Sequence, residues 1–207
     1  TSAGGGSNLT CWGQQTANWS GAGSGLLGNG EAPYLHVATP AVENVLQVSA
    51  SDTHVCAVVG ATATSTTGDV YCWGGNLLGA VGDGSATDRS VPIRVDGLGG
   101  AATSVDVGMW HSCAVVGGVA KCWGGNGTPH PGWFSYDATD VTVLGQLGVS
   151  DRDRSLVPID VPTPGGSVRS VSAGNGNHTC AVLVNDAWSC WGDGGAAQVG
   201  VPGVQRG

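Results

Sequence analysis

One stretch of the sequence decides the fold, and it reads His111-Ser112-Cys113-Ala114-Val115-Val116-Gly117-Gly118-Val119-Ala120-Lys121-Cys122-Trp123-Gly124. Two valine-containing runs flank the pair Gly117-Gly118, and a Gly-Gly pair supplies the positive φ angles of a two-residue hairpin turn. Such a turn sets Cys113 directly opposite Cys122, at a Cα separation that suits a disulfide. The stretch therefore predicts a β-hairpin closed by a disulfide.

The elements of this hairpin recur along the chain in a fixed order. His-x-Cys-Ala-Val occurs at residues 54–58, 111–115 and 178–182, and Cys-Trp-Gly occurs at 11–13, 72–74, 122–124 and 190–192. A Gly-x-Leu/Val-Gly turn follows at 25–28, 79–82 and 145–148, with a degenerate copy at 197–200, and Pro-x-x-Val follows at 92–95 and 158–161. Recurrence of this kind indicates a repeat architecture. The approximate repeats are 1–40, 41–95, 96–162 and 163–207, within one domain.

The spacing of the other cysteines predicts two more disulfides within hairpins and leaves one cysteine without a partner. Cys180 and Cys190 fit a hairpin around Asn185-Asp186 if one residue enters a bulge, and Cys56 and Cys72 enclose a longer loop. Cys11 precedes every His-x-Cys strand and has no mate. An odd cysteine indicates an absent partner strand or a bond between chains. We therefore expect the mate of Cys11 outside these residues or in an adjacent subunit, with no closed ring formed by this chain alone.

The ordered motifs His-x-Cys-Ala-Val, Cys-Trp-Gly-x-Asn, Gly-Gln-Leu-Gly and Pro-x-x-Val resemble the repeat of the regulator-of-chromosome-condensation family, especially its cysteine-bearing branch. The resemblance covers about three full repeats plus a leading half. It implies an all-β propeller of four-stranded blades, about seven in the full-length family. For this chain we expect a partial β-propeller of about four blades, with residues 125–144 as an inserted loop outside the blade sheets.

Composition, charge and the lack of known motifs exclude several classes of function. Glycine accounts for 38 of 207 residues, which fits many tight turns. A net charge of −8 argues against a nucleic-acid partner. The sequence has no apolar run long enough to span a membrane and no recognisable catalytic motif. We predict neither an enzyme nor a cofactor.

The repeated histidines and tryptophans each allow two interpretations. His54, His111 and His178 could be zinc ligands, but three copies on three blades favour a structural role, with each ring bonded to a neighbouring blade. The repeat tryptophans could stack on sugars, but their fixed place favours packing between blades. Four further tryptophans lie outside the pattern, namely Trp19, Trp110, Trp133 and Trp188.

Two groups of residues are candidates for contact with other molecules. Trp133, Phe134 and Tyr136 form an aromatic cluster in the insertion, typical of a binding loop. Asn8, Asn18 and Asn126 begin glycosylation sequons in predicted loops, whereas the sequon at Asn177 precedes a core strand.

Local disulfides indicate an oxidising compartment. The sequence thus predicts an extracellular or cell-surface propeller module that binds a protein or a glycan, or that assembles with further copies of itself. A guanine-nucleotide exchange factor-like role and an enzyme-inhibitor propeller are the alternatives.

Overall fold

The computed structural model describes residues 8–11, 26–28, 39–128, 142–163, 165–174 and 176–195. Every regular element in these ranges is a β-strand, and none of them contains a helix long and apolar enough to cross a membrane. The strands are β1 (Leu9–Cys11), β2 (Thr39–Val42), β3 (Val45–Ala50), β4 (His54–Val59), β5 (Asp69–Gly74), β6 (Arg89–Arg94), β7 (Ala102–Val107), β8 (His111–Val116), β9 (Val119–Gly125), β10 (Gly127–Thr128), β11 (Thr142–Val143), β12 (Arg154–Asp160), β13 (Val168–Ala173), β14 (His178–Leu183) and β15 (Trp188–Gly192).

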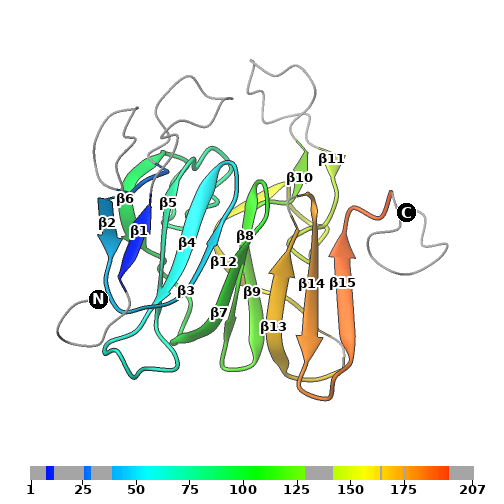
Figure 1. The fold of residues 1–207 in the computed structure, drawn as a ribbon. Coiled ribbons are helices and arrows are strands. Elements are labelled where there is room, and N and C mark those ends of the chain that lie inside the picture. Colours follow the sequence, from blue (N-terminus) through cyan, green and yellow to red (C-terminus); the bar gives the residue numbers. More distant parts are fainter. Residues whose placement is uncertain are drawn as a thin grey trace.

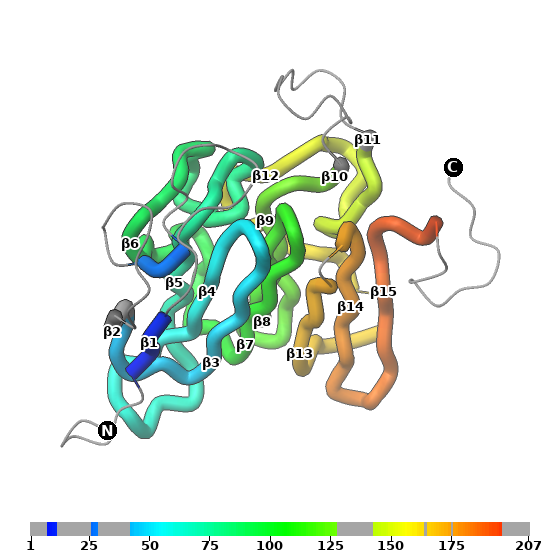
Figure 2. The backbone as a smooth tube through the Cα atoms, turned by 45° about the horizontal axis from the view of Figure 1, so that its top comes forward, coloured from blue at the N-terminus to red at the C-terminus, as the bar shows by residue number. Residues whose placement is uncertain are grey.

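The strands form antiparallel sheets that stand side by side as blades (Figure 1). We call β1–β2 blade A, β3-β4-β5-β6 blade B, β7-β8-β9-β12 blade C and β13-β14-β15 blade D. Successive innermost strands β3, β7 and β13 contact one another, and Figure 2 shows them following one another from blade to blade. Blades A and D lie at opposite sides of the array. The architecture is the predicted all-β partial propeller.

The hairpin of blade C follows the predicted register. Gly117 and Gly118 have φ angles of 58° and 80°, and Cys113 lies opposite Cys122. In blade D, Cys180 lies opposite Cys190, and the Leu183 N–H donates to the Ala187 carbonyl to close a longer loop. The extra residue predicted there is accommodated with Asp186 at a φ of 65°.

The inserted loop begins slightly later in the sequence than residue 125, the start predicted for it. Gly125 still pairs with Arg154 inside the blade, so the start of the insertion at residue 125 is corrected. Beyond it, β10 and β11 pair with each other in a two-stranded ribbon separate from the blade sheet. Trp133, Phe134 and Tyr136 lie outside the described residues.

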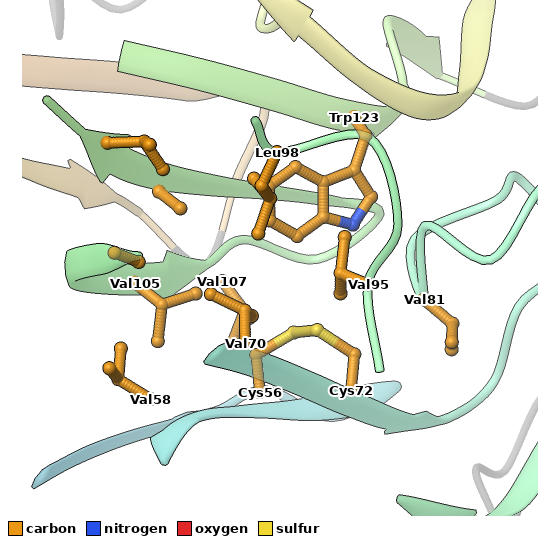
Figure 3. Packing of buried hydrophobic residues seen from close by; sticks show 13 residues of the cluster. Cys56, Val58, Val70, Cys72, Val81, Val95, Leu98, Val105, Val107 and Trp123 are labelled. Carbon is orange, nitrogen blue, oxygen red and sulfur yellow. A yellow bond between two sulfur atoms is a disulfide. The ribbon is translucent and has the colours of Figure 1, made fainter. Parts of the chain in front are cut away.

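The hydrophobic core lies between blades rather than within them. Between blades B and C, the Cys56–Cys72 disulfide and Val70 face the inner strand of blade C and the indole of Trp123 (Figure 3). A second cluster joins blades C and D through Leu147. Because alternate residues of a strand point to opposite faces, each blade has one face toward the blade before it and one toward the blade after it.

Candidate functional site

A hydrogen-bonded triad of side chains, namely His54, Ser112 and Trp123, joins blade B to blade C. The Nε2 atom of His54 lies 2.7 Å from the Ser112 hydroxyl, and that hydroxyl donates to the Ala80 carbonyl at 2.8 Å. The Trp123 indole donates to the same carbonyl at 2.8 Å. Since the single hydroxyl proton of Ser112 goes to Ala80, the His54 Nε2 must carry the hydrogen between them. The Gly-x-Leu/Val-Gly turn of one blade thus anchors the tryptophan of the next.

The same triad recurs between blades C and D. His111 Nε2 lies 2.8 Å from the Thr179 hydroxyl, which donates to the Gln146 carbonyl at 2.9 Å. Trp191 donates to that carbonyl at 3.0 Å. Between blades A and B only part of the pattern remains, because Trp73 donates to the Leu26 carbonyl but Val55 occupies the position of the hydroxyl.

Both triad histidines are neutral at ordinary pH. Complete burial lowers the pKa of His54 from 6.5 to about 3, and burial also lowers the pKa of His111 to about 3, with a smaller contribution from the charges of the other two histidines. Each ring bonds to the neighbouring blade, as the structural interpretation predicts. Among the described residues, no group of three His, Cys, Asp or Glu side chains is arranged to hold a metal.

Inner strands add a second set of bonds between blades. The Asp106 carboxylate accepts a hydrogen bond from the Ser49 hydroxyl of blade B and another, at 2.8 Å, from the Ala173 N–H of blade D. The Val107 N–H donates to Ser49 at 3.2 Å. One carboxylate thereby links three consecutive blades.

Among the described residues, no blade covers the face of blade D that corresponds to the buried faces of blades B and C. His54 and His111 are fully buried, whereas His178 is half-buried and Ser172 is exposed. The most exposed large hydrophobic side chains among the described residues are Val184 and Trp188, at 64% and 60%. We call this surface the open face of blade D; its members are Ser172, His178, Cys180, Val182, Trp188 and Cys190.

The three predicted cysteine pairs are bonded in the structure. The S–S distances are 2.08 Å for Cys56–Cys72, 2.16 Å for Cys113–Cys122 and 2.02 Å for Cys180–Cys190. The first two disulfides are fully buried between blades, and the third is half-buried on the open face. Cys11 is a free thiol packed against the blade B face, and burial raises its pKa.

One glycosylation candidate is wrong. Asn126 is fully buried, and its amide donates to the Val149 and Arg152 carbonyls while its side-chain oxygen accepts from the Leu147 N–H, each at 2.8 Å. A glycan has no room there, so we withdraw Asn126. Asn8 is exposed, and Asn18 lies outside the described residues.

The role of Asn126 is to hold a loop, and sequence reasoning missed it. Asn76 occupies the same place in blade B, where its amide donates to the Thr87 carbonyl at 3.0 Å and its oxygen accepts from the Val81 N–H at 2.9 Å. The signal was present in the shared segment Cys-Trp-Gly-Gly-Asn. Its coincidence with a sequon in one copy masked its structural meaning.

Several known proteins are similar to this chain. Residues 67–115 match the regulator of chromosome condensation (RCC1) repeat. The chain is 29% identical over 191 residues to the ultraviolet-B receptor UVR8 of Arabidopsis thaliana. The alignment covers 87% of this chain and 38% of that protein.

Solved structures share the fold. Prp20p from Saccharomyces cerevisiae superposes with a TM-score of 0.65 at 19% identity, covering 94% of this chain and 43% of that one. Human WBSCR16 superposes with a TM-score of 0.62 at 21% identity, covering 82% of this chain and 40% of that one. The chain spans less than half the length of each of these relatives.

Proposed function

The chain belongs to the regulator-of-chromosome-condensation (RCC1) propeller repeat family, and we propose that it is a non-enzymatic module that binds a protein partner in an oxidising, extracellular environment. The observation that carries the proposal is the open face of blade D, which no other blade covers within the described residues. The corresponding face is covered twice in this chain by a following blade. Contiguous exposed apolar surface of this kind typically marks a protein contact.

The chemistry of the described residues supports binding rather than catalysis. The most strongly perturbed pKa values belong to His54 and His111, and both side chains are engaged in holding blades together. Perturbed groups that are committed to structure do not indicate a reaction site. A protein contact needs only shape, apolar area and a few polar groups, all of which the open face has.

Relatives support the same use of the fold. One solved structure is of yeast RCC1 (Prp20) with Kap60 bound, and the Prp20p structure is described with its binding properties to Gsp1p and histones. Those partners belong to those proteins. For this chain we propose only that the propeller binds a protein partner. Contact of at least one of Trp133, Phe134 and Tyr136 with a partner or a sugar is a separate prediction, which falls outside the described residues.

Two disulfides sealed between blades and one at the surface support the oxidising compartment. In protein isolated under alkylating conditions from its native source, all three pairs should resist alkylation before reduction. Mild reductant should then open Cys180–Cys190 first, because access governs thiol–disulfide exchange. Finding the six cysteines as free thiols in the native protein would contradict the compartment.

Binding is tested with a photo-crosslinking residue at Ser172, which is exposed on the open face. The matched control carries the same residue at Val91, which is exposed on the outer strand β6. In native-source material we expect adducts with protein from position 172 and not from position 91. Equal labelling from both positions, or none, would contradict a binding role for the face.

A further inference from the structure

We propose that Thr66 and Thr67 are acceptors for O-linked sugars, which shield the loop between β4 and β5 from proteases. We call residues 60–68 the β4–β5 loop. The modification rests on the oxidising compartment of the proposed function and goes beyond the binding role. Blade B packs against blade A on one side and blade C on the other. The loop is exposed because it continues past the ends of β4 and β5, at the lower left of Figure 2.

The hairpin of blade B is longer than those of the blades that follow it. Cys56 and Cys72 are 16 positions apart, whereas the equivalent pairs of blades C and D are 9 and 10 apart. Blade C makes the same turn with Gly117-Gly118 alone. None of residues 61–67 belongs to the hydrophobic clusters between blades. Packing therefore does not account for the added length.

The composition of the loop points to modification of hydroxyl groups. Of the seven residues 61–67, two are alanines and five carry a hydroxyl, namely Thr62, Thr64, Ser65, Thr66 and Thr67. All seven except Ser65 are exposed. Segments rich in Ser and Thr, together with Pro, typically carry O-linked sugars. Small neutral neighbours leave such hydroxyls open to a transferase.

Two of these hydroxyls are free to react. The Thr62 hydroxyl lies 3.3 Å from that of Thr64 and 3.2 Å from that of Ser65, so these three form a network. Within the described part of the chain, the hydroxyls of Thr66 and Thr67 make no hydrogen bond. A sugar on either of them therefore displaces no existing contact of the loop.

The backbone around these two threonines is also accessible. Proline favours O-linked acceptors because it keeps the chain out of regular structure and removes a backbone donor. The β4–β5 loop has no proline, but its tip makes a single backbone bond, from the Ser65 N–H to the Thr62 carbonyl at 3.1 Å. Its base is held by Gly68, which exchanges two backbone hydrogen bonds with Ala102. The acceptor segment is thus free while its position is fixed.

The transfer needs an activated sugar, with a nucleoside diphosphate or a lipid phosphate on its anomeric carbon. The threonine hydroxyl oxygen forms a bond to that carbon while the bond from the carbon to the phosphate breaks. The hydroxyl proton passes to a base of the transferase, and the phosphate leaves with the electron pair. The threonine side chain needs only an accessible oxygen.

Thr87 provides a matched control on the same blade. It is exposed and lies in a similar run, Gly84-Ser85-Ala86-Thr87. Its N–H donates to the Ser85 hydroxyl at 3.2 Å, and its carbonyl accepts from the Asn76 amide at 3.0 Å. A transferase cannot draw this backbone into its own site without breaking those bonds. We therefore expect Thr87 to stay unmodified.

A sugar at Thr66 or Thr67 would protect the loop. Exposed tips built from small, polar residues are preferred sites of proteolytic cleavage. The loop lacks Lys, Arg and aromatic residues, so the relevant proteases are those that cut after small side chains. After such a cut, the two pieces would remain joined by the Cys56–Cys72 disulfide.

The first test is mass spectrometry of protein from its native source, digested with an Asp-specific protease. Cleavage before Asp52 and Asp69 releases residues 52–68, and cleavage before Asp83 and Asp88 releases the control peptide 83–87. We expect hexose- or N-acetylhexosamine-sized additions on residues 52–68, assigned to Thr66 or Thr67 by electron-transfer fragmentation, and none on 83–87. Replacing both threonines with alanine should remove the additions, whereas Thr87→Ala should leave them.

Cys56 lies in the same peptide, so alkylation before and after reduction shows whether the disulfide was present in the same molecules. A bonded Cys56 with no added sugar would overturn the modification and leave the proposed function intact. A free Cys56 with no added sugar would contradict both the modification and the compartment. Phosphate in place of sugar, or sugar on Thr62, Thr64 or Ser65 alone, would also overturn the assignment.

The second test concerns protection. An elastase-type protease should cut the unmodified chain, made in a host that adds no sugar, several-fold faster in the β4–β5 loop than it cuts the native-source protein. The pieces should separate only after reduction. Trypsin is the control, because the loop offers it no site, and it should cut both forms alike. Equal cleavage of both forms by the elastase-type protease would exclude the shielding role.

Discussion

His54 and Ser112 join two blades through a hydrogen bond of 2.7 Å, although 58 positions separate them in the sequence. The residue directly after each repeat histidine is Val55, Ser112 or Thr179, and the two hydroxyls are the ones that meet the histidine of the preceding blade. The hydroxyl and the histidine are adjacent in sequence but point to opposite faces of their strand. Blade C thus accepts a hydrogen bond from blade B through Ser112 and donates one to blade D through His111.

Ser112→Ala should destabilise the fold by about 1–3 kcal/mol, because it leaves the buried His54 N–H without an acceptor. The Ala80 carbonyl keeps its bond from Trp123, so the loss is confined to the histidine side. Equilibrium urea unfolding measures the change. Ser90→Ala, at an exposed position of β6, is the control and should change stability by less than about 0.5 kcal/mol. An equal, small effect at both positions would show that the triad contributes nothing to stability.

Acid should weaken the protein through its buried histidines. The pKa values of His54 and His111 fall from 6.5 to about 3 on folding, so the unfolded chain binds more protons between these values. Stability therefore declines as the pH is lowered from 6.5 toward 3, by up to about 1.4 kcal/mol per pH unit for each histidine. Below pH 3 this contribution levels off.

The measurement is the free energy of unfolding at several pH values between 6.5 and 5, where carboxyl groups remain ionised. His54→Gln should reduce the slope by about half, since one of the two buried imidazoles is gone. An unchanged slope in this variant would show that His54 does not govern the pH dependence.

Local features were predictable from the sequence, and contacts between blades were not. The pair Gly117-Gly118 sets the register that places Cys113 opposite Cys122, because a two-residue turn determines every cross-strand neighbour. The bond from His54 to Ser112 depends on how two sheets face each other, which no short segment encodes. Asn126 was misread for the same reason, since a sequon is a three-residue pattern that carries no information on burial.

Trp188 lies between these cases. Its place outside the repeat pattern was visible in the sequence, but its meaning required the strand register. Only the pairing of Val182 with Trp188 shows that the indole replaces the small Val70 and Ala120 of the other blades.

Gly82→Ala should be more damaging than Gly84→Ala. Both glycines have positive φ angles, 77° and 78°, so alanine is strained to a similar extent at each. A Cβ on Gly82 would lie 2.6 Å from Nε1 of Trp123, whereas a Cβ on Gly84 meets no atom within 4 Å. The difference between the two variants isolates the contact with the indole, which we expect to cost about 1–3 kcal/mol.

Thermal or urea unfolding of the two variants provides the comparison. Equal destabilisation would mean that the turn shifts freely and that the Gly82–Trp123 approach does not constrain the blades.

Glycosylation should distinguish Asn8 from Asn126. Asn8 is exposed immediately before β1, whereas Asn126 is buried and its amide makes three hydrogen bonds to the loop that it anchors. A sugar on Asn126 would remove an amide hydrogen that the loop needs and would require space that the folded chain does not have. In a secretory host that glycosylates asparagine, we expect folded protein to carry a glycan at Asn8 and none at Asn126.

Peptide mapping before and after enzymatic removal of the glycan tests this expectation, in a background with both Asn18→Gln and Asn177→Gln that leaves the two sequons to be compared. Asn8→Gln should abolish the mobility shift without loss of stability, because the side chain lies at the surface. Asn126→Gln should leave the shift intact and destabilise the protein, because the longer side chain cannot keep all three bonds to Leu147, Val149 and Arg152. Secreted, folded protein with a glycan on Asn126 would show that this loop is not held as the structure has it.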